Sequence, residues 1–229
     1  MQNISNKLIV ALDVNNCKEA KRLVARLLPR VKIFKIGPIL FTAYGPQAVE
    51  LIRKKGGEVF LDLKFHDIPN TVALAVRQAA RLKVMMLTLH ISGGEEMLKR
   101  ASQAAKEEAA KLKIKKPILL GITILTSDKE GVNTRKIVLE KAQLAKKAGL
   151  DGIVCSVHEA AGVRRACGKN FVIVTPGIRP KGTDAGDQKR VATAAEAFKA
   201  GADYIVVGRP ILEAKDPLEA AKNIIKELE

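Results

Sequence analysis

The chain has 229 residues, of which 47% are hydrophobic and 28% are charged. This length suits one hydrophobic core, and no apolar run is long enough for a membrane-spanning helix, so we expect a cytoplasmic protein with one domain over residues 1–229 and no membrane partner. The net charge of +16 would suit a nucleic-acid-binding protein, but aromatic residues make up only 3% of the chain and most cations fall on predicted solvated helix faces, so nucleic acid is not the expected partner.

Short apolar runs recur along the chain and are separated by segments with apolar residues at helical spacing. The runs are residues 8–12, 32–37, 58–63, 84–90, 118–125, 152–156, 171–176 and 204–208. Alternating strands and helices predict a parallel sheet, and eight such units predict a closed (β/α)8 TIM barrel of the α/β class. An open, doubly wound sheet is the alternative, but no GxGxxG motif follows the first run to favour it.

The third run leads into the residues DLKFHDIPNT, from Asp62 to Thr71. Side chains alternate along a strand, so Asp62 and Lys64 are expected on the same face. Asp67 falls in the turn that follows, before a helix with Pro69 in its first turn. A buried aspartate and lysine hold each other ionised, either as a structural ion pair or as catalytic groups.

The active site of such a barrel lies at the C-terminal ends of its strands, where several polar residues are predicted to meet. They are Asp13, Lys35, Asp62, Lys64, Asp67, His90, Thr126, Arg179 and Arg209. Asp13, Lys35, Asp62 and Lys64 come from adjacent strands and form a plausible alternating array. Two neighbouring ion pairs at a barrel mouth are more typical of catalysis than of a structural contact.

The last strand and the segment after the seventh both indicate phosphate binding. Gly208 allows backbone N–H groups to approach an anion, and Arg209 adds a fork of donors. Residues 175–190 are rich in glycine, proline and charge, which suggests a mobile lid that brings Arg179 and Gln188 onto a phosphate. An ordinary solvent-exposed loop is the competing interpretation.

These residues together resemble the orotidine 5′-phosphate decarboxylases, which convert orotidine monophosphate to uridine monophosphate. The matching segments are ALD at 11–13, FKIG at 34–37, DLKFHDIPNT at 62–71, LTS at 125–127, TPGIR at 175–179, Gln188, and VVGR at 206–209. The DxKxxDIPNT motif is the most specific of them, whereas LTS or VGR alone would mean little.

The resemblance implies a role for each matching residue. Lys64 would donate a proton to C6 of the pyrimidine, Asp62 would lie beside the departing CO₂, and Asp67 would reach across from a partner subunit. The implied substrate-binding residues are Asp13, Lys35, Asp62, Thr71, Thr126, Pro176, Arg179, Gln188, Gly208 and Arg209. Among these, Asp13 and Lys35, the latter a catalytic residue, would orient the charged array and hold ribose hydroxyls. Thr126 would lie near the pyrimidine, and the last four would surround the phosphate.

The resemblance also implies a homodimer with shared active sites and a reaction without metal or cofactor. The three cysteines and three histidines have none of the spacings typical of a metal site. Two rival functions remain open at this point. Sugar-phosphate decarboxylases and synthases share an Asp-x-Lys-x-x-Asp core but use magnesium, and a basic nucleic-acid-binding protein would explain the net charge.

Overall fold

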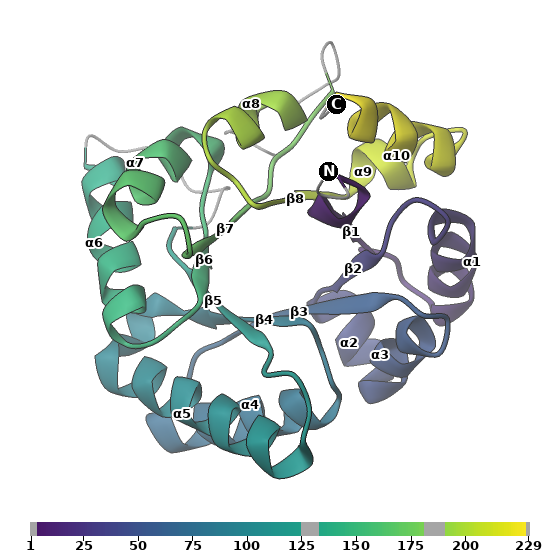
Figure 1. Ribbon diagram of the computed structural model, residues 1–229. Coiled ribbons are helices and arrows are strands. Elements are labelled where there is room, and N and C mark those ends of the chain that lie inside the picture. Colours follow the sequence, from purple (N-terminus) through teal and green to yellow (C-terminus); the bar gives the residue numbers. More distant parts are fainter. Residues whose placement is uncertain (1–3, 125–132, 181–190, 228–229) are drawn as a thin grey trace.

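Parallel strands close into a barrel in the order β1-β2-β3-β4-β5-β6-β7-β8, surrounded by helices (Figure 1). The computed structural model describes residues 4–124, 133–180 and 191–227. The strands are β1 (Leu8–Ala11), β2 (Ile33–Ile36), β3 (Glu58–Phe65), β4 (Met86–His90), β5 (Ile118–Ile122), β6 (Gly152–Val154), β7 (Val172–Thr175) and β8 (Tyr204–Val207). The predicted TIM barrel is confirmed, with each strand inside or close to its predicted run.

Helices connect successive strands and form the outer ring of the barrel (Figure 1). They are α1 (Cys17–Leu27), α2 (Pro38–Tyr44), α3 (Pro46–Arg53), α4 (Pro69–Arg81), α5 (Gly94–Leu112), α6 (Thr134–Lys147), α7 (Val157–Cys167), α8 (Ala194–Lys199), α9 (Arg209–Leu212) and α10 (Pro217–Lys226), with short 3₁₀ helices at Ile4–Lys7 and Ile91–Gly93. None of the helices described could cross a membrane, being too short or too polar.

Side-chain alternation divides the hydrophobic residues into two cores. In β2, Phe34 and Ile36 pack outward against the helices, whereas Ile33 packs inside the barrel. Burying a side chain of this size stabilises the fold by roughly 1.5–3 kcal/mol, so the register of each strand is strongly fixed. The next inward position of β2 is Lys35, near the C-terminal end of the strand. The alternation that builds the core therefore also directs a cation into the barrel mouth.

The close contact between β6 and β7 generates a test of this packing. A Cβ added at Gly152 would lie 2.1 Å from the carbonyl oxygen of Val172, so Gly152→Ala must displace backbone. We expect the free energy of unfolding in urea to fall by about 2 kcal/mol or more. Gly162→Ala, within α7, is the matched control: its Cβ would meet only Leu139 at 3.5 Å, and we expect a gain of roughly 0.5–1 kcal/mol. Equal stabilities of the two variants would contradict this packing.

Candidate active site

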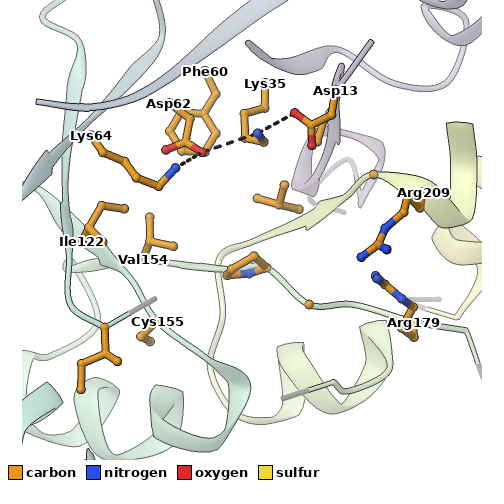
Figure 2. A pocket seen from close by; sticks show the side chains of 16 residues that line it. Asp13, Lys35, Phe60, Asp62, Lys64, Ile122, Val154, Cys155, Arg179 and Arg209 are labelled. Carbon is orange, nitrogen blue, oxygen red and sulfur yellow. Dashed lines mark hydrogen bonds and ion pairs between the residues drawn. The ribbon is translucent and has the colours of Figure 1, made fainter. Parts of the chain in front are cut away.

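A cavity of about 230 Å³ opens at the C-terminal ends of the strands (Figure 2). Its lining residues are Ala11, Asp13, Lys35, Phe60, Asp62, Lys64, Ile122, Ile124, Val154, Cys155, Pro176, Gly177, Arg179, Val206, Gly208 and Arg209. The charged residues among them lie on two sides of the cavity, and apolar side chains lie between. An elongated ligand with an anionic group at one end would match this distribution of charge.

Four side chains, one just after β1, one on β2 and two on β3, form a line of alternating charge on one side (Figure 2). The Nζ of Lys35 lies 3.2 Å from Asp13 Oδ1 and 3.5 Å from Asp62 Oδ2. The Nζ of Lys64 lies 2.9 Å from the same Oδ2 of Asp62. Gly37 leaves room for this line, since a Cβ there would lie only 3.2 Å from Lys35 Nζ. Asp62 thus carries one negative charge between two positive ones.

Lys64 has an unusual backbone conformation that a regular strand does not provide. Its φ is +51°, in the left-handed region, and the pairing of β3 with β4 shifts register between Leu61 and Phe65. Such a conformation costs a non-glycine residue roughly 1–2 kcal/mol. The buried Thr88 on β4 holds it: Thr88 Oγ1 accepts a hydrogen bond from the Lys64 amide at 2.9 Å and donates one to Asp62 Oδ1 at 3.0 Å. One hydroxyl therefore positions both charged residues.

Asp62 is only 8% exposed, yet its surroundings favour the ionised form. Burial by itself would raise the pKa of this carboxyl, because a charge loses water. The cations Lys35 and Lys64, and the hydrogen bonds from Lys64 and Thr88, outweigh burial and lower the pKa below its ordinary value. The carboxylate consequently remains charged throughout the neutral range.

Arg179 and Arg209 lie on the other side of the cavity, with their guanidinium groups directed toward one another (Figure 2). Arg209 is the first residue of α9, directly after Gly208 at the end of β8. Arg179 is held by the backbone: its N–H donates to the carbonyl oxygen of Ala192 at 2.9 Å, beside the bridge between Ile178 and Ala192. Guanidinium pairs of this kind suit a phosphate group.

Most of the predicted site residues meet in this cavity, and the others fall into two groups. Asp67 and Thr71 are exposed and do not line the cavity of their own chain. Thr126 and Gln188 lie outside the described residues, as does most of the segment predicted to be a lid. The residues that line the cavity are Asp13, Lys35, Asp62, Lys64, Pro176, Arg179, Gly208 and Arg209.

His90, a further residue predicted at the mouth, lies at the end of β4 and does not line the cavity. Its ring centroid is 5.4 Å from that of His66. Burial lowers the pKa of His90, and the nearby His66, Lys64 and Lys141 act in the same direction. A neutral His90 adds no further positive charge beside Lys64.

Sequence reasoning missed Thr88 and the apolar wall formed by Ile122, Ile124 and Val154. The signal for Thr88 was a single polar residue at an inward position of an apolar strand. That signal is weak, because threonine is common in strands for its β-branched shape alone.

Comparison with known proteins finds relatives that match this chain over nearly its whole length. The model of the Orotidine 5′-phosphate decarboxylase / HUMPS family matches residues 6–224. The orotidine 5′-phosphate decarboxylase of Moorella thermoacetica is 50% identical, with 98% of this chain and 92% of the relative covered, and that of Trichlorobacter lovleyi is 49% identical, with 97% and 95% covered. The crystal structure of orotidine 5′-phosphate decarboxylase from Lactobacillus acidophilus matches with a TM-score of 0.85 and 34% identity, covering 98% of this chain and 99% of that one.

The surroundings of Asp62 predict its titration. In a carbon-13 NMR titration, we expect its midpoint below the ordinary 3.8, and we expect Lys35→Ala to raise it, because burial is then less opposed. Because the folded-state pKa is the lower one, this carboxylate adds stability above the unfolded pKa, and the contribution is lost as pH falls through the folded value. The control is Lys54→Ala, which removes an exposed lysine paired with Glu50. An unchanged midpoint in the Lys35 variant would contradict the electrostatic account.

Proposed function

The chain belongs to the orotidine 5′-phosphate decarboxylase / HUMPS family, and from that premise we propose that it converts orotidine 5′-monophosphate to uridine 5′-monophosphate in pyrimidine biosynthesis. The main support for this proposal is the cavity with charged residues on two sides. The line from Asp13 to Lys64 suits a reacting pyrimidine and its ribose, while Arg179 and Arg209 suit a phosphate on the other side. We take residues 1–229 as one catalytic domain in the cytoplasm.

The difficulty of this reaction is electronic. Loss of CO₂ from C6 leaves an electron pair in the plane of the ring, where no conjugated group can accept it. Stabilisation must come from a cation and dipoles that are already in position. Lys64 supplies the cation, since Asp62 and the Thr88 hydroxyl fix it before the substrate arrives. Its ammonium group then gives a proton to C6, which completes the product without a cofactor.

Asp62 and its neighbours act on the substrate in distinct ways. The Asp62 carboxylate lies beside the substrate's carboxylate, and the repulsion between them is relieved when CO₂ departs. Lys35 holds Asp62 from the other side and, with Asp13, binds ribose hydroxyls. The apolar wall of Ile122 and Val154 limits water near C6, which strengthens these electrostatic interactions.

The phosphate is remote from C6, and its binding energy assists the reaction indirectly. Arg209, the backbone at Gly208 and Arg179 bind it, with Gln188 contributing from the segment after β7. Pro176 and Thr126 complete the pocket around the pyrimidine. Energy from this contact holds the pyrimidine ring against the charges that are already in position around C6.

We further propose a homodimer in which Asp67 and Thr71 complete the partner's site. Both residues are exposed, and neither lines the cavity of its own chain. The adjacent Ile68 and Leu74 are 66% and 54% exposed, which is unusual for large apolar side chains and supports burial against a second copy. In such a dimer, the Asp67 carboxylate of one subunit would lie next to Lys64 of the other.

A magnesium-dependent sugar-phosphate reaction is the rival within the same group of barrels. Across residues 4–124, 133–180 and 191–227, no three His, Cys, Asp or Glu side chains are grouped as metal ligands. The discriminating assay follows the absorbance of orotidine 5′-monophosphate in EDTA. Unchanged turnover supports our proposal, whereas activity that depends on added magnesium would favour the rival.

Replacing the proposed proton donor tests the mechanism. We expect Lys64→Ala to lower kcat by at least about 10³-fold, because the cation beside C6 and the proton are both lost. Uridine 5′-monophosphate should still bind through its phosphate, as measured by calorimetry. Lys54→Ala, on the exposed surface of the barrel, serves as the control and should leave kcat unchanged. Near-normal turnover by the Lys64 variant would refute the assignment.

Mixing two inactive variants tests the shared site. Lys64→Ala and Asp67→Ala homodimers each lack one required group in both sites. In a mixed dimer, one site recovers both groups, so random exchange of subunits should restore about a quarter of wild-type activity. No recovery, with exchange verified by native mass spectrometry, would show that Asp67 does not act across the interface.

A further inference from the structure

A second cavity, of about 790 Å³, lies at the opposite end of the barrel, where the strands begin. Its rim is strongly basic. The charged residues that line it are Lys32, Arg53, Lys83, Lys115, Lys116 and Glu58. Decarboxylation uses none of them, although they account for part of the net charge of +16.

The cations at this end are poorly neutralised. Lys116 donates a hydrogen bond to Asp151, its ion-pair partner. Within the described parts of the chain, neither the other four rim cations nor Glu58 takes part in an ion pair or a side-chain hydrogen bond. The cations come from the connections before β2, β4 and β5 and from the end of α3 before β3, so they lie along one side of the barrel (Figure 1). Like charges around one cavity repel one another, and a multivalent anion would relieve that repulsion.

Lys83 occupies a backbone position at which glycine would be less strained. Its φ is +55°, and its N–H bonds to the carbonyl three residues earlier at 2.8 Å. Gly56, Gly149 and Gly201 make the same turn with positive φ and the same type of hydrogen bond. Lys113, just before the rim residue Lys115, is a second lysine in this turn, with φ of +52°. Of the three such turns beside the basic rim, two therefore have lysine, and the third has Gly56, which itself lines the cavity.

A helix-end lysine has one ordinary explanation, which is the attraction of a cation to the C-terminal end of a helix dipole. That attraction acts at every helix end of the barrel, and the equivalent turns after α6 and α8, whose glycines do not line the cavity, nevertheless have glycine. The two lysines are confined to the side of the barrel where the cavity lies. A ligand bound at that side would account for the location of these two lysines.

We propose that this cavity binds a linear chain of phosphate groups, either free or as part of a nucleoside triphosphate. The volume lies within the range of small-molecule pockets, roughly 300–1,000 Å³. Several separate cations match several phosphates better than one. Ile33, Met85 and Tyr204 from the base of the barrel interior provide an apolar floor on which a nucleoside base can lie. Nucleic acid fits less well, because the site is a recessed cavity with one aromatic side chain.

The test is calorimetric titration with inorganic tripolyphosphate while saturating uridine 5′-monophosphate occupies the cavity at the other end. We expect one molecule bound per chain. The double variant Lys83→Gly/Lys115→Ala should bind at least about tenfold more weakly, because two rim cations are lost. Its melting temperature should not fall, since glycine relieves the left-handed turn, and Lys115→Ala alone provides a second variant with an unaltered backbone.

The matched control is Lys18→Ala/Lys21→Ala, which removes the same charge from the exposed face of α1. It should retain full affinity. Equal weakening in both double variants, or no saturable binding, would overturn the proposal in favour of non-specific attraction.

Titration with adenosine triphosphate distinguishes the two sources of phosphate. If it binds more tightly than tripolyphosphate, the nucleoside base contacts the apolar floor. If the two bind equally, the cavity recognises the phosphates alone. Tighter binding of duplex DNA, lost in the rim variant, would overturn the ligand class.

Discussion

The ion pairs of Asp62 are the interaction on which the rest of the site depends. A carboxylate this buried would be costly if unpaired, and it is stable here because Lys35 and Lys64 lie on either side of it. The same pairing fixes the ammonium of Lys64 at the point where the proposed reaction develops negative charge. Removing Asp62 would leave the two lysines facing one another without the carboxylate between them, so the array depends on this residue. Stability and chemistry are therefore properties of the same four side chains.

The barrel fold places the ion pairs of Asp62 and the two arginines at the same end of the molecule but on different sides of the cavity. Strands β1, β2 and β3 are neighbours and carry the alternating charges, while Arg179 and Arg209 follow β7 and β8. Closure of the barrel brings these two sets to one mouth, separated by an apolar wall. In the reaction that we propose, a substrate that spans the gap is bound through its phosphate and reacts at its other end. The opposite end of the barrel has its own, separate concentration of positive charge.

Much of this arrangement could be predicted from the sequence, because alternation within strands is a strong signal. It predicted that Asp62 and Lys64 share one face of their strand, and the eightfold order of strand and helix predicted the barrel. The left-handed backbone of Lys64 could not be predicted, since lysine rarely adopts it and the register shift arises from pairing with β4. Thr88 was missed because threonine is ordinary in strands. The basic rim was not predicted either, because residues as far apart in the sequence as Lys32 and Lys115 line one cavity only when the barrel closes.

The most direct measurement is a crystal structure with uridine 5′-monophosphate bound. We expect the phosphate to contact Arg209 and C6 of the pyrimidine to lie within about 3.5 Å of Lys64 Nζ, with Asp62 still paired to both lysines. In that orientation, proton transfer between Lys64 and C6 needs no rearrangement. A nucleotide bound with its ring at the arginines, or with C6 turned away from Lys64, would contradict the proposed role of Lys64 as the proton donor.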